Sequence, residues 1–312
     1  MARALANGIS LGASGTLGDT AKNGALTFGG AVSLTANATL NVSSGVLFNG
    51  AVGGAFGMTK NGSGELTLGG MNTFGGSVTV NGGTLTLTNG GAIPDAAVVT
   101  VNSPGSLKVL ADETVGGLVG SGAVSLLGST LTINASTVNG FSGVISGTGA
   151  LVKDGTGAVI LGGASTFTGG VSLNAGTIKI ANNSGLGSGV LTMSGGVIMS
   201  DSMTDRSVSN GYAWSGGITL GNATNTGILS FTGNGSLTSN VLLNSPSPVD
   251  LTGVISGSGG LTKSGSGVLT LRGMNTFSGG LTLNSGPLEL GSDSALGTGG
   301  FGLSGGSVSS DG

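Results

Sequence analysis

The chain of 312 residues contains no cysteine and no histidine, and only 7% of its residues are charged. Without cysteine, the fold uses no disulfide and no thiolate metal site. Without histidine, it lacks the commonest general base, the commonest zinc ligand and the base of a serine triad. The nine basic residues are scattered singly, so no basic patch indicates nucleic acid. These absences argue against most catalytic and all nucleic-acid-binding classes of protein.

Long hydrophobic segments are also lacking. No apolar run approaches the length that a helix needs to span a bilayer. The opening stretch, MARALANGIS, lacks the apolar region of a signal peptide. If the protein is exported, we therefore expect its signal to lie outside these 312 residues.

Glycine, in contrast, is abundant, with 69 residues. Collagen is excluded because glycine does not occupy every third position. Disorder requires low hydrophobicity or high net charge, whereas 38% of these residues are hydrophobic and the net charge is only −3. The composition therefore predicts a folded chain with glycine at many turns.

Short alternating runs such as ELTL, SVTV, TIKI and VLTL recur along the chain. They place Leu, Val or Ile on one face of a strand and Thr, Ser or Lys on the other. NGG, GSG and SGG separate the runs and supply turn residues. The pattern predicts an all-β fold.

One phrase occurs three times, over 58–87, 151–180 and 261–290. Its lysines are Lys60, Lys153 and Lys263, and each is followed at a constant spacing by a Phe and an Asn. A second and longer register aligns Arg3 with Arg206 and continues towards the end of the chain. The sequence thus reads as a long repeat over 3–205 followed by a partial copy over 206–312. We expect a single solenoid segment over 1–312 that is part of a longer array.

A shorter step lies inside each copy, where the pair Leu269 and Leu271 recurs as Leu288 and Leu290. A step of about 20 residues is the size of one coil of a parallel β-helix. The chain should therefore form a right-handed parallel β-helix, a β-solenoid of about 15 coils of about 20 residues, with Leu269, Leu271 and Phe277 in its core. Propeller blades are longer, at about 40 residues or more.

The phrase LTKSGSGVLTLRGMNTFSGGLTLNSGPLEL, which begins at Leu261, resembles the autotransporter-associated β-strand repeat, also called the passenger-associated transport repeat. The copy at Lys153 departs from the pattern, with Ala-Ser-Thr-Phe in place of Met-Asn-Thr-Phe. The resemblance implies a right-handed parallel β-helix in a passenger domain that is exported through the outer membrane of a Gram-negative bacterium. It also implies a translocating barrel, for which these 312 residues hold no sequence.

The lysine beside Gly-Ser-Gly in LTKSGSG invites comparison with a phosphate-binding loop. Such a loop places its glycines before the lysine and a helix after it. Here the lysine comes first and the strand-like VLTL follows. We therefore expect Gly265 and Gly267 to turn the chain while Lys263 keeps its charge in solvent.

Two acidic clusters are candidate sites. Asp201 and Asp205 lie near the only Tyr and the only Trp, but the long repeat aligns Tyr212 with Ile9 and Trp214 with Leu11, which predicts core positions. Asp112 and Glu113 are adjacent, so in a strand they face opposite sides. The nonapeptide of calcium-binding β-helices is missing. We predict no catalytic, cofactor or metal site, and no enzyme activity for this segment.

Three functions remain open. The first is a structural stalk of an exported surface protein, a scaffold for an adhesin whose ligand is bound by other regions. The second is a subunit of a self-associating extracellular fibre, because exposed strand edges and uncapped solenoids tend to stack. The third is a binding module for a flat surface such as glycan, although Lys179, Arg272 and Glu289 interrupt its rows of threonine.

Overall fold

The computed structural model describes residues 2–19, 21 and 24–311. All regular structure in these residues is β-strand, joined by turns and bends, which confirms the all-β prediction. The strands divide between two compact units. Unit 1 comprises Met1–Val152 with Ser165–Thr168, and unit 2 comprises Lys153–Ala164 with Gly169–Gly312.

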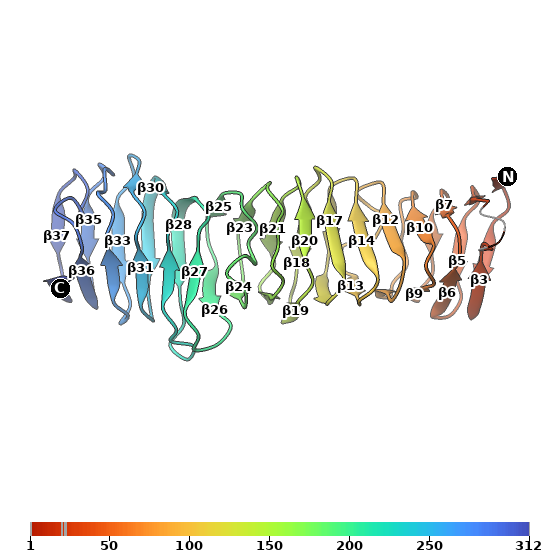
Figure 1. Cartoon of the computed structure of the whole chain (residues 1–312), viewed down its shortest axis with the longest axis horizontal. Helices are drawn as coiled ribbons and strands as arrows, with labels where there is room; N and C mark the ends of the chain where they lie inside the picture. Colours follow the sequence, from red (N-terminus) through yellow and green to blue (C-terminus); the bar gives the residue numbers. More distant parts are fainter. Residues whose placement is uncertain (1, 20, 22–23, 312) are drawn as a thin grey trace. The chain divides into compact units, whose positions relative to one another are not determined.

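Unit 1 consists of short strands that follow one another in chain order (Figure 1). They are β1 (Arg3–Leu5), β2 (Ile9–Leu11), β3 (Ser14–Leu17), β4 (Leu26–Phe28), β5 (Val32–Leu34), β6 (Ala38–Val42), β7 (Val46–Phe48), β8 (Val52–Gly53), β9 (Met58–Asn61), β10 (Glu65–Leu68), β11 (Val78–Val80), β12 (Thr84–Leu87), β13 (Val98–Val101), β14 (Ser106–Val109), β15 (Glu113–Val115), β16 (Gly117–Gly120), β17 (Ala123–Leu126), β18 (Leu131–Asn134), β19 (Asn139–Phe141) and β20 (Ile145–Gly147). The next strand, β21 (Leu151–Asp154), contributes residues to both units.

Unit 2 has the same construction. Its strands are β22 (Ala158–Leu161), β23 (Val171–Leu173), β24 (Thr177–Ile180), β25 (Leu191–Met193), β26 (Val197–Ser200), β27 (Arg206–Val208), β28 (Tyr212–Leu220), β29 (Leu229–Phe231), β30 (Gly235–Asn244), β31 (Val249–Leu251), β32 (Ile255–Ser256), β33 (Leu261–Ser264), β34 (Leu269–Leu271), β35 (Leu281–Leu283), β36 (Pro287–Leu290), β37 (Phe301–Leu303) and β38 (Ser307–Ser310).

Strand pairing in both units is parallel and connects each strand to the equivalent strand one coil away. In unit 1, Leu66 of β10 lies between Val46 of β7 and Leu85 of β12. In unit 2, Leu269 of β34 lies between Val249 of β31 and Leu288 of β36. The predicted step between Leu269 and Leu288 is therefore one coil of a parallel β-solenoid.

The core follows from the alternation of the strands. Strands such as β9, β11 and β33 bury every second side chain, because successive residues point to opposite faces. Leu269, Leu271 and Phe277 are completely buried, as predicted, and so is Phe167. Threonine and serine occupy many of the outward positions, so each coil presents a polar flank around an apolar centre. In the part of the chain that the structure describes, no helix is long and apolar enough to cross a membrane.

Candidate functional site

The three repeated lysines are the most prominent polar groups of the core. Lys60 on β9, Lys153 on β21 and Lys263 on β33 each have an exposed fraction of 0%. Alternation puts them on the inward face, and Lys263 pairs with the buried Leu243 and Leu283 of the neighbouring coils. The prediction that Lys263 keeps its charge in solvent was therefore wrong.

Each ammonium group is held by backbone carbonyls of two successive turns. Lys60 Nζ donates to Gly62 O at 3.2 Å and, one coil later, to Gly82 O at 2.7 Å. Lys263 Nζ donates to Gly265 O and Ser285 O, both at 3.1 Å, and to Ser264 O at 3.5 Å. Lys153 Nζ makes the equivalent bonds, to Asp154 O, to Gly155 O at 2.9 Å and to Ala175 O at 3.4 Å. The lysine thus links two coils at their corners.

A glycine of the next coil makes room for each ammonium. These glycines are Gly83, Gly176 and Gly286, with φ between +59° and +74°. A Cβ on Gly286 would lie 2.9 Å from Lys263 Nζ and 2.1 Å from Gly265 O. The left-handed backbone and the close approach both require glycine there. Gly265 also has a positive φ of +89°, in agreement with its predicted place at a turn.

Burial lowers the pKa of these lysines. Loss of hydration lowers the pKa of Lys263 to about 8, and it lowers that of Lys60 to about 8 against the attraction of Glu65. The pKa of Lys153 is lowered by the same cause, opposed by Asp154. An ammonium has three donors, and carbonyls of the turns accept two of them at Lys60 and three at Lys153 and Lys263. The lysines are thus built to join coils, and the geometry gives no cradle for a phosphate.

A second set of buried polar groups binds backbone at another corner of the coil. Asn275 Oδ1 accepts from Ile255 N at 2.8 Å, and its Nδ2 donates to Ala295 O at 2.6 Å. Asn72 makes the same pair of bonds, with Val52 N and Ala92 O, both at 2.7 Å. These are the asparagines of the Asn-Thr-Phe motif. The motif therefore places a side-chain amide between the backbones of the preceding and the following coil.

The Lys153 copy has Ser165 where the other copies have asparagine. Its hydroxyl oxygen accepts from Ile145 N at 3.2 Å, which is the bond that Asn275 makes to the preceding coil. The Ala-Ser-Thr-Phe departure thus keeps one of the two backbone contacts with a shorter side chain.

Glu113 also binds backbone groups of the preceding coil, with its carboxyl group in place of an amide. It is 2% exposed, and it accepts from Ala92 N at 3.3 Å and from Ile93 N at 3.0 Å. Burial raises the pKa of Glu113 to about 7, and the two N–H groups oppose the rise. Asp112 beside it is exposed, which confirms that the two carboxyl groups face opposite sides. The pair is not a two-carboxylate site.

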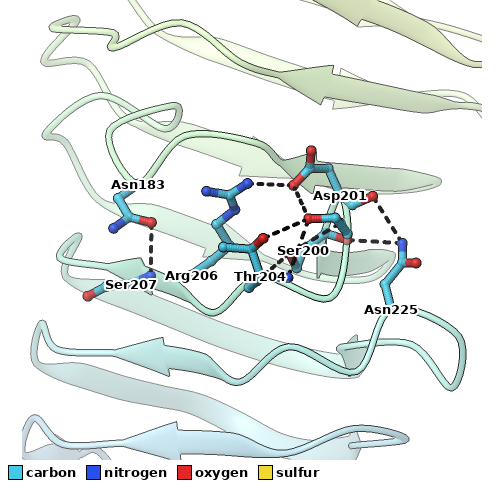
Figure 2. Close-up of polar contacts among 8 residues, drawn as sticks. Asn183, Ser200, Asp201, Thr204, Arg206, Ser207 and Asn225 are labelled. Carbon is cyan, nitrogen blue, oxygen red and sulfur yellow. Dashed lines mark hydrogen bonds and ion pairs between the residues drawn. The ribbon is translucent and has the colours of Figure 1, made fainter.

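Asp201 and Asp205 belong to a surface loop between β26 and β27. Figure 2 shows Asp201 and its neighbours in this loop. Asp201 forms an ion pair with Arg206 at 2.7 Å, and Ser200 Oγ donates to Thr204 O at 2.8 Å. Asp205 accepts from Ile228 N at 2.8 Å. Each carboxylate therefore has its own local partner, and the two do not form one cluster.

Tyr212 and Trp214 lie in the core, as the long repeat predicted, with exposed fractions of 2% and 0%. Their rings stack with centroids 4.2 Å apart, and each meets Phe231 edge to face at 5.5 Å. A Cβ on Gly235 would lie 2.1 Å from the Tyr212 ring, so glycine in the next coil accommodates the larger side chain. Burial raises the pKa of the Tyr212 hydroxyl. The aromatic pair packs the core and is not a sugar-stacking platform.

One shallow surface groove has its charged side chains engaged by neighbouring residues. This groove, in unit 2, is lined by Asp250, Thr270, Arg272 and Glu289. Arg272 Nε contacts both oxygens of Asp250 at 3.0 and 3.1 Å, and Thr270 donates to Glu289 at 3.1 Å. Among the described residues, no group of three acidic side chains is arranged to hold a metal ion.

Sequence reasoning missed the buried lysines, Glu113 and the bracing asparagines. One signal was available for the lysines. In MTK, LVK and LTK the lysine stands two positions after an inward Met or Leu. Residues two positions apart in a strand point to the same face, so this spacing indicates that the lysine also points inward. The same register marks Glu113, which stands two positions before the inward Val115, but its partners Ala92 and Ile93 lie in a loop one coil earlier and carry no signal of their own.

Comparisons with known proteins agree with these observations. The family model described as Passenger-associated-transport-repeat matches residues 58–87, 151–180 and 261–290. Over 266 residues the chain is 31% identical to the "Adhesin BmaC autotransporter" of Brucella suis biovar 1 (strain 1330). The alignment covers 85% of this chain and 8% of that protein, so the chain spans a small part of its relative's length. No solved structure matches the chain. The chain thus carries three passenger-associated-transport repeats, and they lie in a parallel β-solenoid.

Proposed function

We propose that the chain is a structural stalk of a surface-exposed adhesin of a Gram-negative bacterium. The observation that carries this proposal is the use of the polar positions that recur in the repeat. Lys263 and Asn275 are both turned inward and bound to backbone of adjacent coils. The polar residues that characterise the repeat therefore bind backbone of adjacent coils and are not displayed on the surface. This arrangement suits a scaffold that presents other regions.

The relative's printed name, an adhesin and an autotransporter, supports the same proposal. Sequential stacking of coils also suits export, since each coil can fold on the one before it. Ligand contact is assigned to other regions of the protein. The glycan-binding alternative gains no support, because Arg272 and Glu289 on the flank are engaged with Asp250 and Thr270.

A first experiment tests the location. Antibodies raised against the purified chain should label intact cells that express the protein at native level, with permeabilised cells as the control for total protein. Labelling only after permeabilisation, with the chain in the cytosolic fraction, would overturn the proposal.

A second experiment tests the scaffold role. Deleting residues 281–300 removes one coil, because Leu281 pairs with Phe301, and it puts the positive-φ Gly306 in the place of Gly286 beside Lys263. The shortened protein should still be displayed and should still adhere. A matched deletion of 281–290 breaks the register and should abolish display. Normal display with loss of adhesion in the whole-coil deletion would place the ligand site in this segment and contradict the scaffold role.

A further inference from the structure

One outward face of unit 1 carries rows of uncharged polar side chains on four successive coils. Its strands are β6, β9, β11 and β13, and Figure 1 shows β6, β9 and β13 one after another along the same side. Parallel pairing aligns their threonines in one row, which consists of Thr39, Thr59, Thr79 and Thr100. The row points outward, because the residues on either side of each threonine are buried.

A second row follows two positions later on the same face. It consists of the asparagines Asn41, Asn61, Asn81 and Asn102. Asn81 Nδ2 donates to Asn61 Oδ1, and Asn102 Nδ2 donates to Asn81 Oδ1, both at 2.9 Å. Asn81, inside this ladder, thus uses one of its two donors and one of its two acceptor lone pairs. The ladder fixes the direction of the amides and leaves half of the hydrogen-bonding capacity of Asn81 for another molecule.

Beside the threonine row the face is hollowed. A groove of about 320 Å³ is lined by Asn37, Gly57, Met58, Thr59, Ser77 and Thr79. Gly57 keeps the groove open, because a Cβ there would lie 2.3 Å from Ser77 O. Asn37 Oδ1 accepts from Gly57 N at 2.9 Å, which fixes the Asn37 amide at the rim. The groove therefore brings hydroxyl and amide groups together around a space that no side chain of its own coil fills.

The chemistry of this face favours an uncharged partner that is rich in hydroxyl groups. Threonine hydroxyls and asparagine amides both donate and accept hydrogen bonds, as sugar hydroxyls do. None of the outward residues on these four described strands carries a charge, so an anionic polymer would meet no cation there. The rows repeat once per coil, at about 4.8 Å. A partner with a regular step along the solenoid axis can therefore repeat one contact from coil to coil.

The size of the face favours a narrow partner. Four coils at about 4.8 Å and five strand positions at about 3.3 Å give it an area on the order of 300 Å². Each partner of a stable protein complex contributes about 800 Å². A second solenoid would therefore gain too little from this face alone. An extended peptide is narrow enough, but its charged and apolar side chains would find no matching groups in the two rows.

We propose that this face binds an extended, uncharged polysaccharide that runs along the axis of unit 1, with one sugar unit against each coil. The sugar hydroxyls exchange hydrogen bonds with the threonine row and the asparagine ladder, and the groove beside Gly57 receives one ring. Arg272 and Glu289 prevent such a contact only on their own flank of unit 2. This inference goes beyond the stalk proposal and does not depend on it, because it adds a contact along the side of the solenoid.

The first test is affinity electrophoresis of the 312-residue chain in native gels that contain a soluble polysaccharide. The neutral probes are hydroxyethyl cellulose, glucomannan and arabinoxylan, and anionic alginate is the comparison. At least one neutral polymer should retard the chain, and alginate should not. Unchanged mobility in all three neutral polymers, or equal retardation by alginate, would overturn the proposal.

The second test assigns the binding to this face. Thr59→Val combined with Thr79→Val removes two hydroxyls from the row and keeps the β-branched shape. The dissociation constant for the polymer should rise at least about tenfold, because two hydrogen bonds are lost. The matched control is Thr27→Val combined with Thr67→Val, at half-buried positions of β4 and β10 in another sheet of unit 1. Equal affinities of the two double variants would show that the polymer binds elsewhere.

The third test measures the register with oligomers of the polymer that retards the chain, by isothermal titration calorimetry. Affinity should rise with each sugar unit up to about four, the number of coils on the face, and then change little. A disaccharide that binds as tightly as the longer oligomers would contradict the arrangement of one unit per coil. Sedimentation velocity without sugar provides the last check. Self-association that Thr59→Val with Thr79→Val abolishes would assign the face to a second copy and refute the proposal.

Discussion

Two buried corners of the coil use opposite chemistry for the same purpose. At the lysine corner, Lys60, Lys153 and Lys263 donate to backbone carbonyls of successive turns. At the amide corner, Asn72 and Asn275 satisfy an N–H of the preceding coil and a carbonyl of the following one. Buried polar groups are tolerated when they are hydrogen-bonded. The comparison shows that the specific residues of the repeat serve the joints between coils.

Charge distinguishes the two corners. The lysine corner holds a buried cation whose pKa is lowered, to about 8 at Lys263. The amide corner is neutral in the repeats, and Glu113 fills a similar position with a carboxyl group whose pKa is raised to about 7. The two corners should therefore respond differently to mutation and in opposite directions to pH.

The largest effect is expected from Lys263→Met, which keeps the length of the side chain and removes its donors. Three carbonyls, those of Ser264, Gly265 and Ser285, would lose this donor. At about 1 to 3 kcal/mol for each buried group left unpaired, the free energy of unfolding should fall by about 4 kcal/mol. Urea denaturation followed by circular dichroism measures it.

The matched control is Lys179→Met on β24, a half-buried lysine at an outward position. It should change the free energy of unfolding by less than about 0.5 kcal/mol. If Lys263→Met were as stable as the native chain, the lysine corner would not be a joint and the comparison would fail.

The next largest effect is expected in the pH dependence of the free energy of unfolding, through the titration of Glu113. Its folded pKa of about 7 lies above the ordinary value of 4.5, so the folded chain binds the proton more tightly between these limits. Stability should therefore fall as pH rises from 4.5 to 7, by about 3 kcal/mol at most. Glu113→Gln should remove this fall, because a neutral side chain does not titrate. A fall of equal size in the variant would assign the effect to other groups.

The lysines act in the opposite sense at higher pH. The pKa of Lys263 is about 8 when folded against 10.5 ordinarily, so the unfolded chain binds more protons between these values. This group should make stability rise as pH increases through that window. Lys263→Met should reduce the rise, whereas Asn275→Ala should leave it unchanged; urea denaturation at a series of pH values distinguishes the two variants.

The smallest effect is expected at the amide corner. Asn275→Ala leaves Ile255 N and Ala295 O without this partner, and it should cost about 2 kcal/mol of unfolding free energy. Asn275→Ser, which copies Ser165 of the middle repeat, should cost about half as much. Asn284→Ala is the control, since Asn284 is exposed. Equal losses of unfolding free energy for Asn275→Ala and Asn284→Ala in urea denaturation would show that the amide corner does not stabilise the joint between coils.

The solenoid could be predicted from the sequence because its signals are local and repeated. Alternation identified Leu269 and Leu271 as inward, and the long repeat placed Tyr212 and Trp214 in the core. The step from Leu269 to Leu288 is the strand pairing itself. Each of these predictions needed only the period of a strand or of a coil.

The polar joints were missed because their partners are backbone groups, and the ones that join coils lie about 20 residues away. Lys263 looked like a surface residue, since lysine is rarely buried without a counter-charge. Its partners are carbonyls, which carry no residue identity, and Ser285 is 22 positions away. The same holds for Asn275 and Glu113, whose partners are backbone groups 20 positions distant.

Amine acylation of the folded chain, resolved by mass spectrometry, tests the burial of the three lysines most directly. At pH 8, Lys60, Lys153 and Lys263 should react at least about tenfold more slowly than the half-buried Lys108 and Lys179, because a reagent reaches them only when the coil opens. In urea all five should react alike. Equal rates for the two groups in the folded chain would show that the ammonium groups face solvent, and would contradict their role as joints between coils.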